Sequence, residues 1–262
     1  PFNSSNSHLF FTLSLHCIKL IVMNLTIDLG NSFCKVIIFQ DNVIVYRDVC
    51  KSLSTRYLQL LFKTYKIEFA MISSVVSLKP ALKNQLKKFK VREFSATVKI
   101  PLKNLYTTPK TLGKDRLANA IAGNFLFPGD NVLVIDSGTC IKYDFVNSKK
   151  QYLGGSISPG LNMRFIALNK LTDQLPLVEI NDSGKLIGNS TVTAIQSGVF
   201  NGMVEEIKGI ISRYKREYGQ LKVILTGGDA QRFAGQLNLS IFAASDLVNI
   251  SLNEIIKYNH SK

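Results

Sequence analysis

The sequence has few of the side chains that build zinc sites or disulfide frameworks. It holds three histidines and four cysteines, Cys17, Cys34, Cys50 and Cys140, and no two cysteines form a C-x-x-C pair. This spacing argues against a structural zinc site. Four scattered cysteines in a chain of 262 residues are typical of reduced thiols in a cytoplasm rather than of a disulfide framework.

Acidic residues are also scarce. There are 18 of them against 32 Lys and Arg, which gives a formal net charge of +14. A basic balance is compatible with nucleic acid, an anionic membrane or a polyanionic small molecule, and it does not choose between them. The one basic cluster is formed by Lys79, Lys83, Lys87, Lys88, Lys90 and Arg92. Its spacing predicts the solvated face of a helix rather than a nucleic-acid patch.

No apolar run is long enough to cross a membrane. The run Leu9–Val22 is short and is interrupted by Ser14, His16 and Lys19. No small-residue cleavage site follows it, and Met23 opens directly into an apolar strand. We therefore expect Met23 to be the native start, residues 1–22 to be a non-native or disordered extension, and the protein to be cytoplasmic with no membrane partner.

What the sequence does contain is a repeated pattern of strand, turn and strand. The apolar run Leu25–Ile27 leads into the turn Asp28–Ser32, and Val132–Ile135 leads into the turn Asp136–Thr139. A second apolar run follows each turn, as in a β-hairpin. The two Asp-x-Gly turns lie 108 residues apart, which indicates an internal duplication and two related α/β halves.

The rest of the chain supplies further helices and strands around these hairpins. We expect strands at Ala70–Val76, 154–158 and Val223–Leu225, helices at Lys79–Phe89, 115–125, Leu161–Leu171 and 190–218, and a loop at Gln174–Asn189. The expected domains are residues 23–130 and residues 131–262.

The turns have the composition of a phosphate site. Glycine lets backbone N–H groups approach phosphate oxygens, and a carboxylate at a strand end can hold Mg²⁺. A lone Asp-x-Gly turn is ordinary turn chemistry. Two such turns in duplicated contexts, with a third glycine-rich turn at Thr226–Asp229, favour a phosphotransferase.

The order of motifs carries a resemblance. It runs D-x-G-N-S, Y-x-x-P-x-x-L-G-x-D-R, D-x-G-T, G-G-x-I-x-P-G and T-G-G-D, and it covers residues 23–257. This order resembles the type III pantothenate kinase family of the actin/hexokinase/Hsp70-like ATPase superfamily, and the segment Tyr106–Arg116 is its most specific part. The resemblance implies an α/β fold of two duplicated ribonuclease-H-like (actin/hexokinase-type) domains, with mixed β-sheets flanked by helices.

The resemblance also implies an activity and a site. The activity is ATP-dependent phosphorylation of pantothenate to 4′-phosphopantothenate, the first step of coenzyme A biosynthesis, by a homodimer whose substrate pocket lies near the subunit interface. ATP with Mg²⁺ would be bound by Asp28, Leu29, Gly30, Asn31, Ser32, Phe33, Cys34, Lys35 and Thr139, with Asp28 near the Mg²⁺. Asp115 would be the general base, pantothenate would contact Tyr106, Gly113, Lys114, Asp115, Arg116 and Thr191, and Asp136 would bind a monovalent cation, K⁺ or NH₄⁺.

Several of these residues have plainer interpretations. Asp115 opens a predicted helix and could be its N-cap, Tyr106 could be a packed aromatic, and Thr191 could be a helix cap. Against the N-cap interpretation, Arg116 beside Asp115 suits the planar carboxylate of pantothenate. Asp144 and Asp229 are interpreted as ordinary turn residues outside the core of the site.

Two residues depart from the family pattern. Cys140 stands where the family has Ala, and Lys142 stands where it has Thr. Cys140 is small and fits conservatively. Lys142 either brings a cation to the expected K⁺ or phosphate region or, as a strand residue, points outward.

Two other functions remain open. The same fold could phosphorylate another small hydroxylated metabolite, although the segment Tyr106–Arg116 argues against it. A non-catalytic regulator that binds nucleotide or DNA through its basic surface is the other alternative. The set Asp28, Asp115 and Asp136 argues against the regulator, because a binding module does not need three carboxylates. We expect no nucleic-acid partner.

Overall fold

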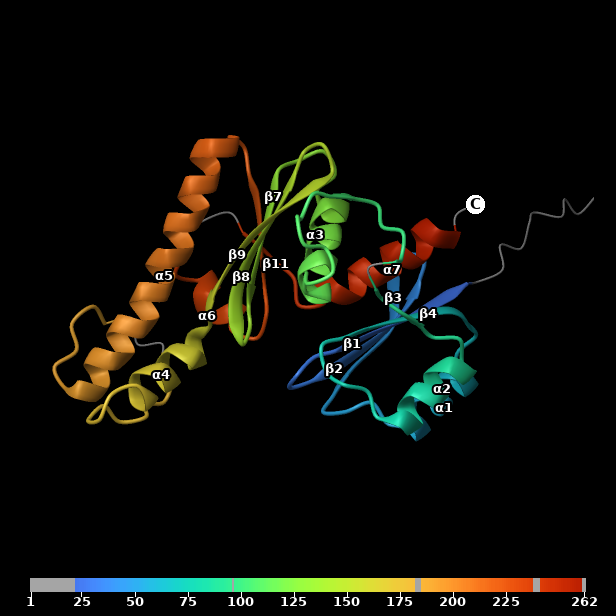
Figure 1. Cartoon of the computed structure of the whole chain (residues 1–262), viewed down its shortest axis with the longest axis horizontal. Helices are drawn as coiled ribbons and strands as arrows, with labels where there is room; N and C mark the ends of the chain where they lie inside the picture. Colours follow the sequence, from blue (N-terminus) through green and yellow to red (C-terminus); the bar gives the residue numbers. More distant parts are fainter. Residues whose placement is uncertain (1–21, 96, 182–184, 238–240, 261–262) are drawn as a thin grey trace, which may run out of the picture.

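The computed structural model describes residues 22–95, 97–181, 185–237 and 241–260 (Figure 1). The expectation for residues 1–22 therefore falls, except for Val22, outside the described residues. Within those ranges, no helix combines the length and apolar character that crossing a membrane requires.

The first sheet is built around the first predicted hairpin. β1 (Met23–Leu29), β2 (Cys34–Gln40) and β3 (Val43–Cys50) form an antiparallel meander. β4 (Ile67–Ser74) and the short β5 (Arg92–Glu93) then add in parallel on the other side of β1. The strand order is β3-β2-β1-β4-β5.

The second sheet repeats this topology. Its strands are β7 (Val132–Ser137), β8 (Cys140–Asn147), β9 (Gln151–Pro159), β10 (Lys222–Thr226) and β11 (Phe242–Ala243), with β6 (Lys103–Asn104) added beside β9. The order β9-β8-β7-β10-β11 again has an antiparallel meander followed by two parallel strands. The predicted duplication and the predicted α/β fold with two mixed sheets are confirmed.

Helices flank both sheets. They are α1 (Thr55–Thr64), α2 (Pro80–Lys88), α3 (Lys114–Leu126), α4 (Leu161–Lys170), α5 (Thr191–Tyr218), α6 (Ala230–Ala234) and α7 (Leu247–His260). On the outer faces, α1 and α2 share an apolar core with β1, β2 and β4, and α4 and α5 share another with β7 and β8. On α2, Leu82 and Leu86 are buried while the lysines are exposed, which confirms the solvated helix face.

α3 and α7 lie side by side between the two sheets (Figure 1). Their apolar side chains, including Ile121 and Leu252, meet in one core cluster. α3 belongs to the first half of the chain but packs on β7 and β8, whereas α7 belongs to the second half and packs on β1, β2 and β4. The halves therefore exchange helices, and the expected division at residue 130 stays a prediction.

Strand alternation decides which side chains face this inner pair of helices. On β1, Leu25 and Ile27 enter the outer core, so Thr26 and Asp28 face inward. Thr26 accordingly accepts a hydrogen bond from Asn249 of α7. On β7, Leu133 and Ile135 enter the outer core, and Asp136 faces α3. The side chains of Asp28 and Asp136 thus point toward the space between the two sheets.

Candidate active site

Three carboxylates and two ammonium groups gather where the inner faces of the sheets meet α3. Asp28 is the penultimate residue of β1, Asp136 lies at the equivalent place on β7, and Asp115 is the second residue of α3. The charges of Asp115, Asp136, Lys35 and Lys142 all act on Asp28. Each of these carboxylates was expected in the site, and the structure brings them together.

Asp28 sits in surroundings that oppose its negative charge. Burial raises its pKa to about 6, the charge of Lys35 works against that rise, and Asp115 and Asp136 add to it. A bound cation favours the charged form of such a carboxylate. Among the described residues, no three His, Cys, Asp or Glu side chains cluster as a metal cage. Mg²⁺ at kinase sites is held by one or two carboxylates and the substrate phosphates, so Asp28 fits it.

Lys142 points into the site. Its Nζ lies 2.7 Å from Oδ2 of Asp115 and 2.8 Å from Oδ2 of Asp136. Burial lowers the pKa of this ammonium, but the two carboxylates raise it, and the net shift is upward. The outward-facing alternative is wrong, because Lys142 stands opposite Asp136 on the antiparallel β7–β8 pair and shares its face.

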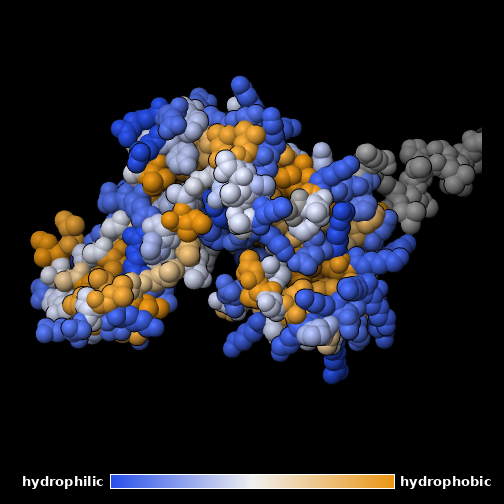
Figure 2. Space-filling model, viewed as in Figure 1, coloured by the Kyte–Doolittle hydropathy of each residue, from blue (hydrophilic) through white to orange (hydrophobic). Residues whose placement is uncertain are grey.

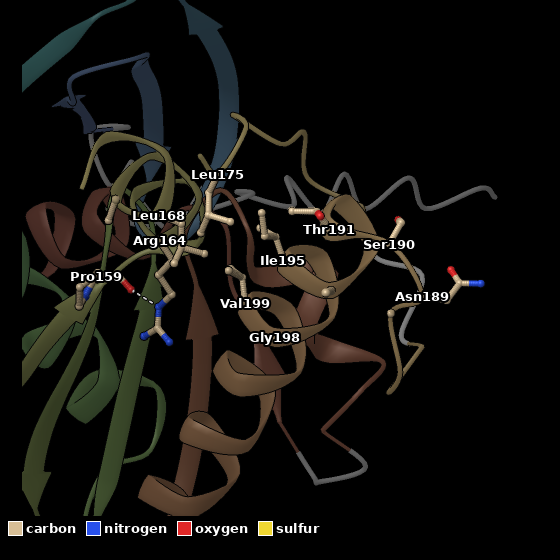
Figure 3. Close-up of a pocket in the computed structure, with 13 residues that line it drawn as sticks. Pro159, Arg164, Leu168, Leu175, Asn189, Ser190, Thr191, Ile195, Gly198 and Val199 are labelled. Carbon is tan, nitrogen blue, oxygen red and sulfur yellow. Dashed lines mark hydrogen bonds between the residues drawn. The ribbon is translucent and has the colours of Figure 1, made fainter. Parts of the chain in front are cut away.

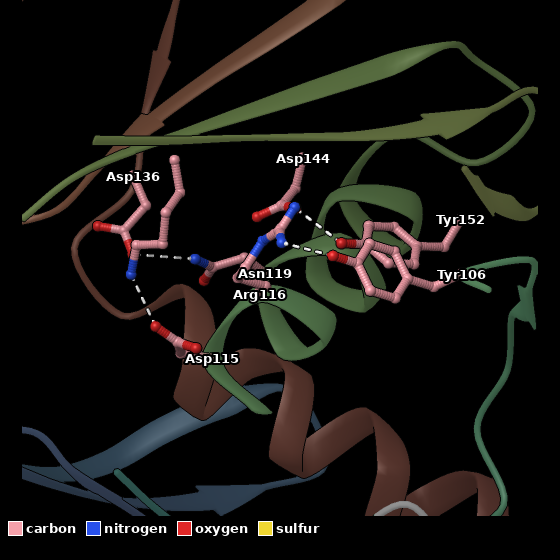
Figure 4. A network of polar contacts seen from close by, with 8 residues as sticks. Tyr106, Asp115, Arg116, Asn119, Asp136, Asp144 and Tyr152 are labelled. Carbon is pink, nitrogen blue, oxygen red and sulfur yellow. Dashed lines mark hydrogen bonds and ion pairs between the residues drawn. The ribbon is translucent and has the colours of Figure 1, made fainter. Parts of the chain in front are cut away.

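Asn119 of α3 completes this corner of the network (Figure 4). Its Nδ2 donates to Oδ2 of Asp136 over 3.4 Å. It is buried one helical turn beyond Asp115. Sequence reasoning missed it, although an amide among the alanines of an apolar helix is a signal of an internal hydrogen bond.

Arg116 forms a buried ion pair with Asp144. The Nε of Arg116 donates to Oδ1 of Asp144 over 2.9 Å, and Nη2 lies 2.7 Å from the same oxygen. Burial lowers the pKa of the guanidinium, but Asp144 raises it, and the net shift is upward. The interpretation of Asp144 as a turn residue is wrong: it lies within β8, where an isolated charge would be unfavourable without this partner.

Two tyrosines lie together on one side of the ion pair (Figure 4). Tyr152, which sequence reasoning did not single out, donates from its hydroxyl to Oδ1 of Asp144 over 2.8 Å. The ring of Tyr106 lies 6.1 Å from that of Tyr152, and the guanidinium of Arg116 lies 5.6 Å from the Tyr106 ring centre. Tyr106 is therefore a packed aromatic whose hydroxyl also lies 3.5 Å from Nη1 of Arg116.

The start of α3 positions Asp115. The N-cap is Gly113, so the interpretation of Asp115 as the N-cap is wrong. A Cβ on Gly113 would stand 2.7 Å from Oδ1 of Asp115, which makes glycine the residue that leaves this carboxylate in place. Lys114 points elsewhere and pairs with Glu93 at 2.7 Å near the surface.

The first hairpin presents its residues in two ways. The side chains of Leu29 and Cys34 are buried in the outer core, so only their backbone can face a ligand. Gly30 donates its N–H to the carbonyl of Phe33 over 3.0 Å and closes the turn, in which Asn31, Ser32 and Phe33 are exposed. Lys35 stands opposite Asp28 in register, and its Nζ donates to the carbonyl of Ser245.

Three glycine-containing turns meet at the end of β7. Gly227 has φ +96°, and a Cβ there would come within 2.4 Å of the carbonyl oxygen of Ser137. Asp229 donates its N–H to the same oxygen over 3.0 Å. A Cβ on Gly160 would lie 2.3 Å from the carbonyl oxygen of Thr139. The turn Thr226–Asp229 therefore packs on the second Asp-x-Gly turn, with Thr139 exposed beside it.

Thr191 lies apart from these residues. It is the first residue of α5 and lines a cavity of about 1070 Å³ between α4 and α5 (Figure 3). The cap of α5 is Ser190, which exchanges hydrogen bonds with Thr193, so the interpretation of Thr191 as the cap is wrong. β8 separates the two regions, because Tyr143 packs toward α5 while Lys142 faces α3.

Two sheets of one topology, with acidic hairpin turns facing an inner pair of helices, define the actin/hexokinase-type ATPase fold. Solved structures agree on the fold. A Campylobacter jejuni protein described as a Baf family transcriptional activator superposes with a TM-score of 0.58 at 22% identity, covering 91% of this chain and 100% of its own. A Listeria monocytogenes protein described as an N-acetylmannosamine kinase gives 0.53 at 10% identity, covering 91% and 100%.

Sequence comparison narrows the class to one family. The family model for type III pantothenate kinase matches residues 24–213. The type III pantothenate kinase of Phocaeicola vulgatus is 45% identical over 90% of this chain and 99% of its own length. That of Christiangramia forsetii is 44% identical over 92% and 100%. The chain belongs to the type III pantothenate kinase family.

Proposed function

We propose that this chain transfers the γ-phosphoryl group of ATP to the hydroxyl of pantothenate, forming 4′-phosphopantothenate in the first step of coenzyme A biosynthesis. Family membership supports the reaction. The observation that carries it at the level of the site is the convergence of Asp28, Asp115 and Asp136 between the two sheets.

Asp115 is the proposed general base. Its Oδ2 is held by Lys142 at 2.7 Å, and its Oδ1 takes the proton of the acceptor hydroxyl as that oxygen attacks the γ-phosphorus. In a loose phosphoryl-transfer transition state most of the catalysis comes from positioning and charge stabilisation. The fixed orientation of Asp115 at the start of α3 supports this role.

Asp28 and the first hairpin are proposed to hold ATP and Mg²⁺. The raised pKa of Asp28, to about 6, supports a cation beside it, and the exposed turn at Asn31 and Ser32 supports backbone contacts to phosphate. When bound, Mg²⁺ neutralises charge on the phosphates. Thr139 lies on the facing turn. Asp136 does not fit a K⁺ site in this chain, because the Lys142 ammonium already lies 2.8 Å from its Oδ2.

The residues around Arg116 are proposed to bind pantothenate. Arg116 and Tyr106 form one wall, and Gly113 and Lys114 stand beside the base. Asp144 and Tyr152 hold the guanidinium in a fixed orientation for this task. Because Arg116 also neutralises Asp144, Arg116→Ala is expected to reduce stability as well as pantothenate binding.

A homodimer completes the proposal, with Thr191 supplied to the pocket by a second copy of the chain. Within one chain Thr191 lies across β8 from Asp115, which supports its supply by a second copy. Apolar side chains are exposed around α4 and the start of α5, where Figure 2 shows hydrophobic surface. They are Met163, Leu171, Leu177, Leu186, Ile187 and Val192. A cytoplasmic location fits the free thiols of Cys34, Cys50 and Cys140.

The test is product formation by the purified full chain. ATP, Mg²⁺ and pantothenate should give ADP and phosphorylated pantothenate, detected by chromatography and mass, and omission of pantothenate should abolish ADP release. Other hydroxylated metabolites serve as competing acceptors. If ADP release depended on another acceptor and not on pantothenate, that acceptor would be the substrate. Salt-sensitive DNA binding without any turnover would favour the regulator instead.

A further inference from the structure

We propose that the ammonium of Lys142 takes the place of a monovalent cation in this chain, so that the reaction runs without K⁺ or NH₄⁺. The inference rests on the proposed function for its activity readout and on the geometry of Asp115, Asp136 and Lys142 for its argument. Lys142 is then a positioning residue, acting through Asp115 and Asp136.

The contacts of Lys142 are those of a bound cation. One Nζ atom lies 2.7 Å from a carboxylate oxygen of Asp115 on α3 and 2.8 Å from one of Asp136 on β7. An alkylammonium group offers three N–H donors and a compact positive charge, as an ammonium ion does. The stem of Lys142 runs from β8, so the charge is tethered and needs no entry from solvent.

Asp136 already has an ammonium and an amide as donors at this corner. Asn119 donates a further hydrogen bond to Oδ2 of Asp136, over 3.4 Å. The side chain of Lys142 is 16% exposed, and those of Asp115 and Asp136 are 26% and 15% exposed. A K⁺ ion placed on Oδ2 of Asp136 would meet the like charge of Lys142 in a poorly hydrated space, which is unfavourable.

The neighbouring carboxylate behaves differently. Asp28 has no ion pair of this kind among the described residues, since the Nζ of Lys35 donates to the carbonyl of Ser245. Among the described residues the structure therefore divides its acids into one without such an ion pair and two that share a tethered ammonium.

The first experiment measures ADP and phosphorylated pantothenate directly, without coupling enzymes. KCl or NH₄Cl replaces tetramethylammonium chloride at constant ionic strength. The full-length wild type should change less than about twofold across the series. Lys142→Thr should lose about a hundredfold or more without K⁺, the scale of a mispositioned base, and should recover at least about tenfold with K⁺ or NH₄⁺. Wild-type activity that rises more than about tenfold with K⁺ would overturn the proposal.

Two control variants sharpen the result. Lys142→Met keeps the length of the stem but removes the charge and fills the space, so K⁺ and NH₄⁺ should not rescue it. Lys149→Thr removes an exposed charge from the β8–β9 turn of the same hairpin and should behave as wild type in every salt. Rescue of the Met variant equal to that of the Thr variant would mean that the cation acts elsewhere.

A second readout needs no substrate. K⁺ or NH₄⁺ should raise the melting temperature of Lys142→Thr above its value in tetramethylammonium, while wild type and Lys149→Thr show no such difference. This measurement decides the proposal even if pantothenate is the wrong acceptor. K⁺-dependent stabilisation of the wild type, or none in the Thr variant, would contradict a tethered substitute for the ion.

Discussion

The two halves of the molecule place an Asp and a Lys at the same register positions and use them in different ways. Asp28 faces Lys35 across β1 and β2, and Asp136 faces Lys142 across β7 and β8. Lys35 reaches the carbonyl of Ser245, just before α7, whereas Lys142 reaches Asp136 and, near the start of α3, Asp115. Among the described residues, one hairpin thus leaves its acid without an ion pair of this kind, and the other pairs its acid with an internal ammonium.

The halves also differ in how the inner helices contact their sheets. α7 meets β1 through neutral amides: Asn249 donates to Thr26, and Asn24 donates to Asn253. α3 meets β8 through the buried charges of Arg116 and Asp144. These two kinds of contact should differ in how much stability is lost when one partner is removed. Removing one partner of a buried ion pair leaves the other charge without compensation.

The largest effect is expected from breaking the charged contact. Asp144→Ala should lower the free energy of unfolding by about 3–5 kcal/mol, because Arg116 stays buried without its partner. Asn249→Ala, the matched change in the other half, should cost only about 1–3 kcal/mol, since it leaves neutral groups unpaired. Urea denaturation of both variants measures the difference. Equal losses would show that the charge on Asp144 has no special weight.

Removing the proposed base comes next. Asp115→Asn should reduce turnover at least about a hundredfold while leaving the fold intact, because the amide cannot accept the acceptor's proton. Turnover is followed by direct measurement of ADP and product. Asp130→Asn, beyond the other end of α3, is the matched control and should retain wild-type turnover. Near-normal turnover of the Asp115→Asn variant would remove Asp115 from the mechanism.

Replacing Asp28 or Asp136 by Asn should affect the free energy of unfolding differently in the two hairpins. The pKa of Asp28 is raised to about 6 in the folded chain, so folding takes up a proton between roughly pH 4 and pH 6. Stability contributed by the neutral form is lost as pH rises through that window. Above pH 6 the charge on Asp28 destabilises the ligand-free fold, and Asp28→Asn should raise stability by about 1–3 kcal/mol.

Two controls are available: the same variant at low pH, and the equivalent variant in the second hairpin. At about pH 4 Asp28→Asn should melt close to wild type, and at about pH 8 several degrees above it. Asp136→Asn should not stabilise the fold at the higher pH, because it removes a partner of Lys142. Thermal melts of both variants without Mg²⁺ test this pair. If Asp136→Asn raised the melting temperature as much as Asp28→Asn, the two hairpin acids would not differ in the way described.

The smallest effect is expected at the exposed ion pair between β3 and the residue just before α7. Arg47 pairs with Asp246 at 3.0 Å, but its side chain is 47% exposed. Such pairs contribute less than about 1 kcal/mol, so Arg47→Ala should shift the unfolding midpoint little, and still less at high salt. A larger loss would indicate that this contact holds α7 on the first sheet.

The duplication could be predicted from sequence, and the helix exchange could not. Two Asp-x-Gly turns in similar strand contexts are visible as a pattern, and the sheets repeat accordingly. Apolar periodicity shows that α3 is a helix, but not which sheet it covers. That choice depends on contacts between residues far apart in the chain, such as Arg116 with Asp144 or Asn24 with Asn253.

The site divides in the same way. Asp28, Asp115 and Asp136 were predicted from their motifs, and they converge. The pairing of Asp144 with Arg116 is not visible in the sequence, because the two residues lie on different elements. The direction of Lys142 depended on knowing which face of β8 meets α3. Thr191 belongs to none of these motifs, and the sequence does not say which face of the sheet α5 covers.

The exchange of α3 and α7 has a consequence for how the chain is made. When the first sheet has left the ribosome, its inner face still lacks α7, and Asn24 and Thr26 lack their amide partners until α7 is synthesised. Vectorial synthesis therefore cannot finish one half before beginning the other. The nascent first half carries an inner sheet face without α7 until that helix is made, the kind of surface on which chaperones act.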